Sequence, residues 1–240
     1  MLKDTSAMIL AAGKGERMRP LTDNCPKPLI SVVGRTMLHR AHDHVRRAGI
    51  ESCVVNAHYL GEQVREAAQE FAKISSEDIL LDTAGGVMNA LVHLKSDPFF
   101  VLNGDVVWVD SSESFLKAMR EMWRPQMRSL IMLVPKENAK GYEGRGDFFR
   151  AEDGTLRRPL KGETAPYIYG GVQLVSKSVF ENHEVKSFSF NVIWDELIPE
   201  RQLYGAVFGG AWFHIGTPQA LSNFEPEIDA LESKVDGKAV

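Results

Sequence analysis

The first 135 residues alternate between short apolar runs and longer segments whose apolar residues recur at helical spacing. A short, continuously apolar run between turn residues is typical of a strand that is buried on both faces of a sheet. Such runs occupy residues 7–10, 50–55, 98–105 and 129–135. Helical spacing predicts helices over residues 36–48, about 62–72, from 87 onward and 111–122. Gly49 stands where a glycine can end the first of these helices.

Beyond Gly141 the pattern changes to short apolar runs separated by glycine turns. The runs at residues 141–150, 151–155 and 166–175 predict antiparallel hairpins that are appended to the sheet. A helix is predicted from about residue 191, with Asn191 as its possible N-cap and Trp194 in the core. Residues 220–231 predict a last helix, and residues 232–240 have the composition of a frayed polar tail.

Together these elements predict an α/β fold, namely a three-layer α/β/α sandwich around a mostly parallel sheet. A chain of 240 residues can hold one sizeable core or two small domains. Because the sequence contains no linker and no internal repeat, we expect a single domain over residues 1–232, with a tail at 233–240.

The composition is that of an ordinary globular protein, with 44% hydrophobic and 25% charged residues. The formal net charge of −4 gives no electrostatic reason to expect binding to nucleic acid or to an anionic membrane. No apolar run approaches the roughly twenty residues of a membrane span, and the start of the chain has no signal-peptide pattern. We therefore expect a cytoplasmic protein, in which Cys25 and Cys53 are free thiols and Cys53 packs in the core.

Three histidines, His39, His42 and His44, fall on the predicted helix at residues 36–48. They form no metal-binding motif, so we expect them to be solvated surface residues.

The stretch from Met8 to Leu29 holds the densest candidate chemistry. An apolar run passes there into a loop with two glycines and three cations, which are Gly13, Gly15, Lys14, Arg17 and Arg19. Small residues let backbone N–H groups approach an anion, and cations offset its charge, so such a loop can hold phosphates. Lys27 follows between two prolines, each of which fixes its own φ, so its ammonium group sits on a stiffened loop.

Two common phosphate-binding motifs do not fit this loop. The dinucleotide fingerprint requires a third glycine where Met18 stands, and the P-loop requires its second glycine at the same position. An ordinary strand-to-helix loop with solvated cations remains the alternative.

Polar residues follow two further predicted strands. Asn56 and His58 come after the run at 50–55, and the run at 98–105 ends in Asn103, Gly104 and Asp105. Open α/β sheets bind ligands beyond the carboxyl ends of their strands, so Asn56 and His58 are candidates for the edge of a pocket. A carboxylate at Asp105 can bind Mg²⁺, which takes one or two carboxylates together with substrate phosphates. The alternatives are polar loops without a ligand and, at Asp105, a turn aspartate.

Taken whole, L-A-A-G-K-G-E-R-M-R-P-L-T at residues 10–22, followed by P-K-P-L at 26–29, strongly resembles the signature of the sugar-1-phosphate nucleotidyltransferases. The resemblance implies their Rossmann-like fold, with a nucleotide-binding half at residues 1–135 and a sugar-binding half at 136–232. It implies that Arg17, Lys27 and Asp105 are catalytic, with Mg²⁺ bound by Asp105. The nucleotide-binding residues that it implies are Leu10, Ala11, Ala12, Gly13, Lys14, Gly15, Asn56, Gly85 and Asn103.

Two later motifs extend the resemblance. D-T-A-G-G at residues 82–86 stands where relatives usually have E-T-G-G-G, whose backbone amides approach the base, and Gly85 and Gly86 keep that close approach possible. G-R-G-D-F at 144–148 and the aromatic-Gly-Gly-Val run at 169–172 resemble the acceptor side of the N-acetylmuramate 1-phosphate uridylyltransferases. They imply that the sugar-binding residues are Asp147, Tyr169 and Gly171.

One motif departs from the family. W-F-H-I-G-T-P at residues 212–218 matches W-x-D-x-G-T-P, except that His214 replaces the aspartate that supplies a second metal ligand. Imidazole suits Mg²⁺ less well than a carboxylate does. His214 either binds the metal weakly, or hydrogen-bonds a phosphate or sugar oxygen, or leaves Mg²⁺ to Asp105, water and substrate.

The resemblance implies in-line transfer of a nucleotidyl group from a nucleoside triphosphate to a sugar 1-phosphate, with pyrophosphate as the leaving group. UTP with N-acetylmuramate 1-phosphate is the favoured pair, in peptidoglycan recycling. GTP with mannose 1-phosphate, or another hexose pair, is the alternative within the class, and an inactive nucleotide-sugar-binding regulator is the alternative outside it. We expect a monomer or small homo-oligomer, with no nucleic-acid or membrane partner.

Overall fold

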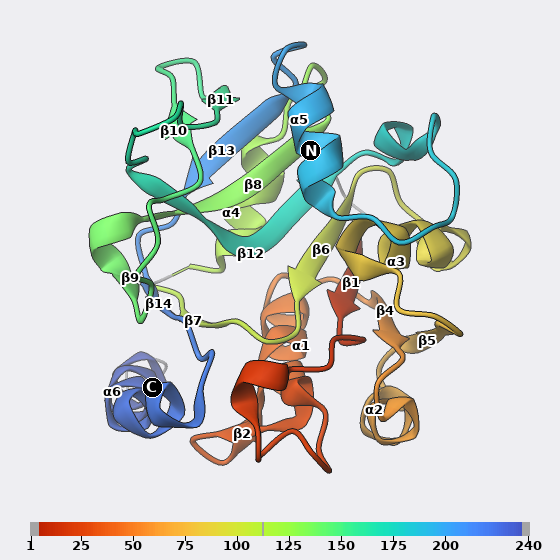
Figure 1. The fold of residues 1–240 in the computed structure, drawn as a ribbon, viewed down its shortest axis with the longest axis vertical. Helices are drawn as coiled ribbons and strands as arrows, with labels where there is room; N and C mark the ends of the chain where they lie inside the picture. The colour runs from red at the N-terminus through yellow and green to blue at the C-terminus, as the bar shows by residue number, and fades with distance from the viewer. Residues whose placement is uncertain (1–4, 112, 237–240) are drawn as a thin grey trace.

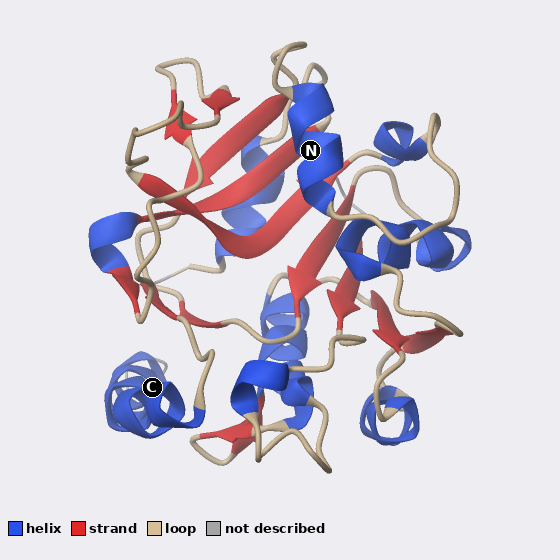
Figure 2. Ribbon diagram, viewed as in Figure 1, coloured by secondary structure: helices blue, strands red, loops and turns tan. Residues whose placement is uncertain are grey.

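The computed structural model describes residues 5–111 and 113–236, and within them a seven-stranded sheet forms the centre of the molecule (Figure 1, Figure 2). In spatial order its strands are β13 (Leu203–Val207), β8 (Ser129–Pro135), β12 (Tyr167–Val175), β6 (Phe99–Asn103), β1 (Ser6–Leu10), β4 (Ser52–Ala57) and β5 (Lys73–Ser76). Neighbours are parallel except at β12, which is antiparallel to both β6 and β8. The mostly parallel sheet is thus confirmed.

The sheet is buried on both faces, because successive side chains of each strand alternate between two hydrophobic clusters. On β1, Ala7 and Ile9 belong to one cluster and Met8 belongs to the other. The first cluster includes side chains of α1 (Met37–Arg47), α2 (Gly61–Ala68) and α4 (Phe115–Met122). The second includes side chains of α3 (Asp82–Ala90) and α5 (Phe190–Leu197). These are the three layers of the predicted sandwich.

A third, smaller core lies beside the sheet. Its strands are β7 (Val107–Val109), β14 (Ala211–Phe213) and β9 (Ala139–Lys140). Helix α6 (Pro218–Asp236) packs on them through Leu221, Phe224 and Ile228, as Figure 1 shows by the position of α6 next to β7 and β14. The predicted packing of Leu221 and Phe224 is confirmed.

Short elements connect these layers. Two hairpins pair β2 (Ser31–Val32) with β3 (Arg35–Thr36) and β10 (Phe149–Arg150) with β11 (Leu156–Arg157). The 3₁₀ helices are η1 (Glu16–Met18), η2 (Lys27–Leu29), η3 (Leu91–His93), η4 (Lys136–Asn138) and η5 (Lys177–Phe180).

Local signals place most helix ends. The Thr36 hydroxyl accepts a hydrogen bond from the His39 N–H at 3.2 Å and caps α1, and Gly49 follows that helix with a φ of +73°. The prediction for α5 is wrong by two residues, because its N-cap is Ser189, whose hydroxyl accepts from the Asn191 N–H at 3.2 Å. Trp194 is buried, as predicted.

The run at residues 166–175 is not an appended hairpin but the central strand β12. Its two glycines mark a bulge, since the register with β8 shifts between Tyr169 and Gln173 and Gly171 has a φ of +84°. A glycine inside a strand can mark either a turn or a bulge, and here it marks a bulge.

Two surface predictions are also wrong. His44 is only 3% exposed and stacks on Trp108, with ring centroids 3.9 Å apart, whereas His39 and His42 are half-buried against Phe71. The expected tail is helical as far as Asp236, because α6 continues through it, and residues 237–240 lie outside the described residues.

Both cysteines are free, and Cys53 is buried as predicted. Every helix in the described ranges is too short or too polar to traverse a lipid bilayer.

The layered core predicts the cost of a cavity beneath the sheet. Phe100 on β6 is fully buried, so Phe100→Ala is expected to lower the free energy of unfolding by about 3–5 kcal/mol, from lost burial and the cavity left behind. Val92→Ala, at a side chain that is 82% exposed, is the control and is expected to change it by less than about 0.5 kcal/mol. Urea unfolding followed by near-UV circular dichroism measures both, and equal losses would contradict this account of the core.

Candidate active site

The glycine loop begins where β1 ends, at the carboxyl edge of the sheet (Figure 1). The Ala11 N–H donates to Oδ1 of Asn56 at 2.7 Å, which ties the loop to the end of β4. Gly15 has a φ of +63°, and a Cβ there would lie 2.7 Å from Cβ of Lys27. Glycine is therefore needed at Gly15 for its left-handed backbone and for this close approach.

Lys27 and Asp105 meet at the same edge of the sheet. Lys27 opens η2, and its Nζ donates to Oδ2 of Asp105 at 2.7 Å. The Lys27 side chain is 8% exposed and that of Asp105 is 40% exposed. Asp105 reaches this position because the Gly104 N–H donates to the Leu10 carbonyl at 2.9 Å, which holds the loop after β6 against the end of β1. Two of the three predicted catalytic residues are thus in direct contact.

Charge controls the protonation of Asp105. Burial by itself would raise the pKa of this carboxyl, but the charge and hydrogen bond of Lys27, helped by His214, lower the pKa below its usual value. Because the folded-state pKa is lowered, the ion pair stabilises the fold at neutral pH and loses this contribution as the pH falls through the pKa of Asp105.

Arg17 and His214 form a second pair beside the first. Arg17 lies on η1, and its Nη1 is 3.4 Å from Nε2 of His214. Burial, and then the charges of Lys27 and Arg17, lower the pKa of His214, although Asp105 acts in the opposite direction. His214 is therefore biased toward its neutral form, and Lys27 and Arg17 remain as the cations of this group.

A cavity of about 620 Å³ lies over these side chains, which is within the usual size range of small-molecule sites. Arg17, Lys27 and Asp105 all line it. The predicted nucleotide-binding residues that also line it are Leu10, Ala12, Gly13, Gly15, Asn56 and Asn103. Ala11 is buried next to them and Lys14 is exposed at the loop. It is also lined by Glu16, Met18, Pro28, Leu80, Asp82, Thr83, Ser187 and Gly216, and Asp82 and Thr83 belong to the D-T-A-G-G motif.

Gly85 does not line this cavity. The D-T-A-G-G motif lies inside α3, where the Gly85 N–H donates to the Phe188 carbonyl at 3.1 Å. A Cβ at Gly85 would lie 2.0 Å from the Lys186 carbonyl oxygen, so glycine is required there by the segment before α5. The Gly85 amide is thus bonded within the chain in this structure, and its expected approach to a base stays a prediction.

Glu77 supports the cavity wall, and sequence reasoning missed it. Its Oε1 accepts from Nδ2 of Asn56 at 2.6 Å, and its Oε2 accepts from the Leu81 N–H at 3.0 Å. Asn56 in turn holds the Ala11 N–H, so one buried carboxylate links two walls of the cavity. A glutamate just beyond a strand resembles any solvated loop residue, and only the fold shows what it contacts.

The three predicted sugar-side residues cluster near Asp105 but do not line the cavity described above. Oδ2 of Asp147 accepts from the Tyr169 N–H at 2.9 Å, which pins the loop before β10 to β12. Burial, and then the negative charge of Asp105, raise the pKa of the Tyr169 hydroxyl. A Cβ at Gly171 would lie 2.7 Å from Cγ2 of Val106, the residue after Asp105. Their contact with a sugar stays a prediction.

A metal ion would find few ligands from the chain alone. Among the residues that the structure describes, no group of three or more His, Cys, Asp and Glu side chains could hold one. Asp105 offers one carboxylate, with one oxygen held by Lys27. This donor set fits an ion such as Mg²⁺ that takes few protein ligands and is held largely by substrate phosphates and water.

The sequence model of the nucleotidyl transferase family matches residues 6–144, which is more than half of the chain and includes the glycine loop, Lys27 and Asp105. The chain belongs to this family.

Two curated relatives resemble nearly the whole chain. N-acetylmuramate alpha-1-phosphate uridylyltransferase of Caulobacter vibrioides is 35% identical over 224 residues, which cover 89% of this chain and 93% of the relative. The protein of the same name from Neisseria meningitidis is 31% identical over 221 residues, which cover 88% and 93%. Among solved structures, a putative glucose-1-phosphate thymidylyltransferase from Bacillus anthracis superposes with a TM-score of 0.77 at 17% identity, covering 93% of this chain and 95% of that one. This last likeness confirms the fold.

The ion pair predicts how Asp105 titrates without its partner. In Lys27→Met the pKa of Asp105 is expected to rise, because burial then acts without the compensating ammonium charge. A ¹³C NMR titration of the aspartate carboxyl carbons measures it. Lys117→Met, at an exposed position of α4, is the control and is expected to leave the Asp105 pKa unchanged. An Asp105 pKa that stays the same in Lys27→Met would argue against the pairing.

The Glu77 contacts predict a specific loss of stability. Glu77→Gln keeps the shape but replaces one of two acceptor oxygens with a donor, so either Asn56 Nδ2 or the Leu81 N–H loses its partner. The free energy of unfolding in urea is expected to fall by about 1–3 kcal/mol. Glu66→Gln, on the exposed face of α2, is the matched control and is expected to have little effect. A similar stability for both variants would show that the Glu77 contacts with Asn56 and Leu81 do not stabilise the cavity wall.

Proposed function

We propose that this protein transfers a uridylyl group from UTP to N-acetylmuramate 1-phosphate, giving UDP-N-acetylmuramate and pyrophosphate. The observation that carries the proposal is the contact of Lys27 with Asp105 in a cavity that the glycine loop and Arg17 also line. The choice of UTP and N-acetylmuramate 1-phosphate is supported by the names of the two curated relatives, which state that activity. It is also supported by the resemblance of the motifs at residues 144–148 and 169–172 to the acceptor side of such enzymes.

The reaction makes one bond and breaks one. A phosphate oxygen of the sugar 1-phosphate attacks the α-phosphorus of the triphosphate in line, and the bond from that phosphorus to the bridging oxygen of the β-phosphate breaks as pyrophosphate leaves. No covalent enzyme intermediate is needed, because positioning and charge neutralisation supply most of the catalysis of such a transfer.

The residues of the chain have separable roles in this scheme. The backbone of the loop from Ala11 to Gly15 faces the triphosphate, and Arg17 binds the departing β- and γ-phosphates. Lys27 neutralises the α-phosphate and the attacking phosphate, from a position that Asp105 fixes at 2.7 Å. Asp105 would hold Mg²⁺, which when bound draws the phosphate oxygens together and offsets their charge.

The remaining assignments follow the same scheme. Asp147, Tyr169 and Gly171 border the acceptor sugar on the far side of Asp105, and neutral His214 hydrogen-bonds a phosphate oxygen rather than binding the metal, because Mg²⁺ prefers oxygen ligands. Residues 1–135 bind the nucleotide and residues 136–232 the sugar. The free thiols Cys25 and Cys53 are in keeping with a cytoplasmic enzyme of peptidoglycan recycling.

The decisive experiment is a matrix of pyrophosphate release. UTP, GTP, CTP and dTTP are each paired with the 1-phosphates of N-acetylmuramate, N-acetylglucosamine, mannose and glucose, with Mg²⁺ and with a chelator. Turnover is expected with UTP and N-acetylmuramate 1-phosphate, and it should need the metal. Lys27→Ala and Asp105→Asn are each expected to lower kcat by about 10²–10³-fold, whereas Lys117→Ala is expected to leave it unchanged.

Each other outcome contradicts a definite part of the proposal. Turnover with GTP and mannose 1-phosphate, or with another pair, would reject the substrate assignment and retain nucleotidyl transfer. Binding of nucleotide without pyrophosphate release from any pair would reject the enzyme in favour of a nucleotide-sugar-binding regulator.

A further inference from the structure

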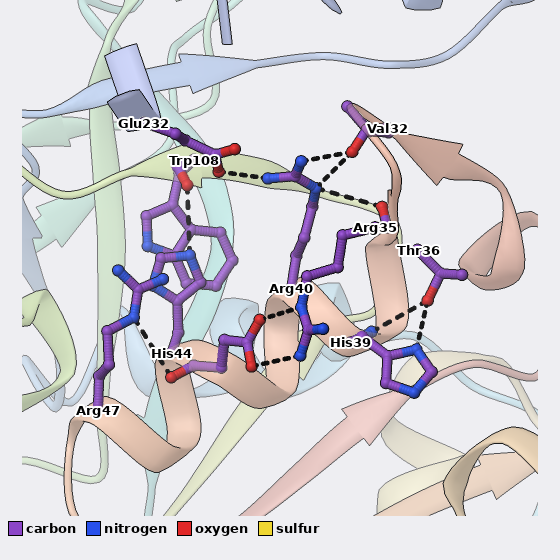
Figure 3. A network of polar contacts seen from close by, with 10 residues as sticks. Val32, Arg35, Thr36, His39, Arg40, His44, Arg47, Trp108 and Glu232 are labelled. Atoms are coloured by element: carbon purple, nitrogen blue, oxygen red, sulfur yellow. Dashed lines mark hydrogen bonds and ion pairs between the residues drawn. The ribbon is translucent and has the colours of Figure 1, made fainter. Parts of the chain in front are cut away.

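A second cavity, of about 530 Å³, lies away from the catalytic residues, between α1, β7 and α6. Its walls carry four arginines from the β2–β3 hairpin and α1, which are Arg35, Arg40, Arg46 and Arg47. Acidic residues at its wall are Asp43 and Glu232, and Val33, His44, Trp108 and Val109 complete it. Figure 3 shows Arg35, Arg40 and Arg47 projecting beside the stacked rings of His44 and Trp108.

Two of the arginines are fixed by the chain itself. Arg35 pairs with both carboxylate oxygens of Asp43, with 2.6 Å between Nη2 and Oδ1. Arg40 is buried, and it binds Glu232 and donates through Nε to the Val32 carbonyl at 3.0 Å. These contacts hold the two guanidinium groups at the cavity wall and use both carboxylates that line it.

Arg46 and Arg47 are exposed and add two positive charges that these carboxylates do not neutralise. Arg47 makes a long contact of 3.4 Å to the Asp43 carbonyl. Cations in the last turn of a helix favour its dipole, which accounts for two arginines at the end of α1. That effect does not explain why Arg35 and Arg40 meet them around one cavity.

The floor of the cavity holds an unsatisfied polar group. His44 is buried, and its Nε2 lies 3.2 Å from the Trp108 carbonyl. Its Nδ1 lies 3.3 Å from Oδ2 of Asp110 without the geometry of a hydrogen bond, and among the described atoms it has no other partner. The carboxylate of Asp110 faces this atom, so His44 and Asp110 form a buried pair next to the arginines.

We propose that this cavity is a second binding site, for a small molecule that bears phosphate groups. Four arginines facing Asp43 and Glu232, with Asp110 next to His44, leave an excess of positive charge, and guanidinium forks match the geometry of phosphate oxygens. The volume is close to that of the catalytic cavity, so it has room for a ligand of nucleotide size as well as for a free polyphosphate.

The site borders the segments that carry the catalytic residues. The β2–β3 hairpin follows Lys27 directly, and β7 with Trp108 follows Asp105. Met18, Ile30 and Val107 pack together in the core that these segments share with α6. A ligand that moved the hairpin or β7 would therefore shift Lys27 or Asp105.

Tryptophan indole signals in a ¹H–¹⁵N NMR spectrum can distinguish the two cavities by their titration midpoints, although Trp108 and Trp212 are paired across β7 and β14. Trp108 lines the second cavity, whereas Trp212 stacks against His214 beside the catalytic one and donates through Nε1 to the Gly170 carbonyl at 3.0 Å. Inorganic tripolyphosphate and UTP are the probes, because they carry the same chain of phosphates. Both are expected to shift the Trp108 signal saturably, with a midpoint different from that of Trp212.

The double variant Arg46→Ala/Arg47→Ala is expected to raise the Trp108 midpoint by about tenfold or more, since each guanidinium–phosphate contact is charge-assisted, and to leave the Trp212 midpoint in place. Arg124→Ala/Arg128→Ala removes the same charge elsewhere on the surface and is the matched control. The Trp194 indole signal, whose Nε1 donates to buried Gln173, verifies that each variant is folded.

The binding outcomes separate cleanly from those of the proposed reaction, because the NMR titration measures no turnover. A Trp108 signal that stays still, follows the Trp212 midpoint, or responds equally in the two double variants would overturn the second site. Tighter binding of UTP than of tripolyphosphate identifies a nucleotide as the ligand, and equal binding identifies the phosphate chain alone. A rate that depends on UTP hyperbolically in both the native protein and Arg46→Ala/Arg47→Ala would overturn any effect of the site on catalysis.

Discussion

The ion pair between Lys27 and Asp105 is the contact on which the geometry of the catalytic cavity depends. A lysine whose side chain is 8% exposed needs a partner, because a buried charge without one is strongly destabilising. That partner stands beyond β6, so the segment with Lys27 is held at the carboxyl edge of the sheet. The contact is possible because Gly15 and Gly104 let the loops come close; a Cβ would lie 2.7 Å from Lys27 at the first and 2.6 Å from the Leu10 carbonyl oxygen at the second.

The antiparallel strand β12 explains how a sheet of parallel strands acquires a second set of polar residues near that pair. Running against β6, it brings its own bulge to the place where β6 ends. The bulge at Gly171 presses on Val106, and Asp147 holds the Tyr169 N–H on the same strand. The carboxyl end of β6 thus meets the middle of β12, and the two halves of the chain share one edge rather than lying apart.

How far the sequence predicts this structure depends on whether the information is local. Continuous apolar runs identified β1, β6 and β8, and the spacing of small and cationic residues identified the loop of Arg17 and the position of Lys27, because each signal lies within a few residues. The contacts of His44, Glu77 and Gly85 cannot be predicted from local sequence, because their partners Trp108, Asn56 and Phe188 are distant in sequence. The bulge in β12 was taken for a turn, since both use glycine and only strand pairing tells them apart.

The replacement of an aspartate by His214 changes the charge that the cavity offers to a triphosphate. With His214 biased to its neutral form, the group of Lys27, Arg17, His214 and Asp105 has one positive charge in excess before any metal binds, while Glu16 and Asp82 line the cavity around it. A second carboxylate would cancel that excess and require a further cation. Burial lowers the pKa of His214 most, and the charges of the same two cations lower it further, so they bias the imidazole toward its neutral form. A neutral His214 and the nearby cations Arg17 and Lys27 therefore act together, and they favour a polyanion next to these side chains.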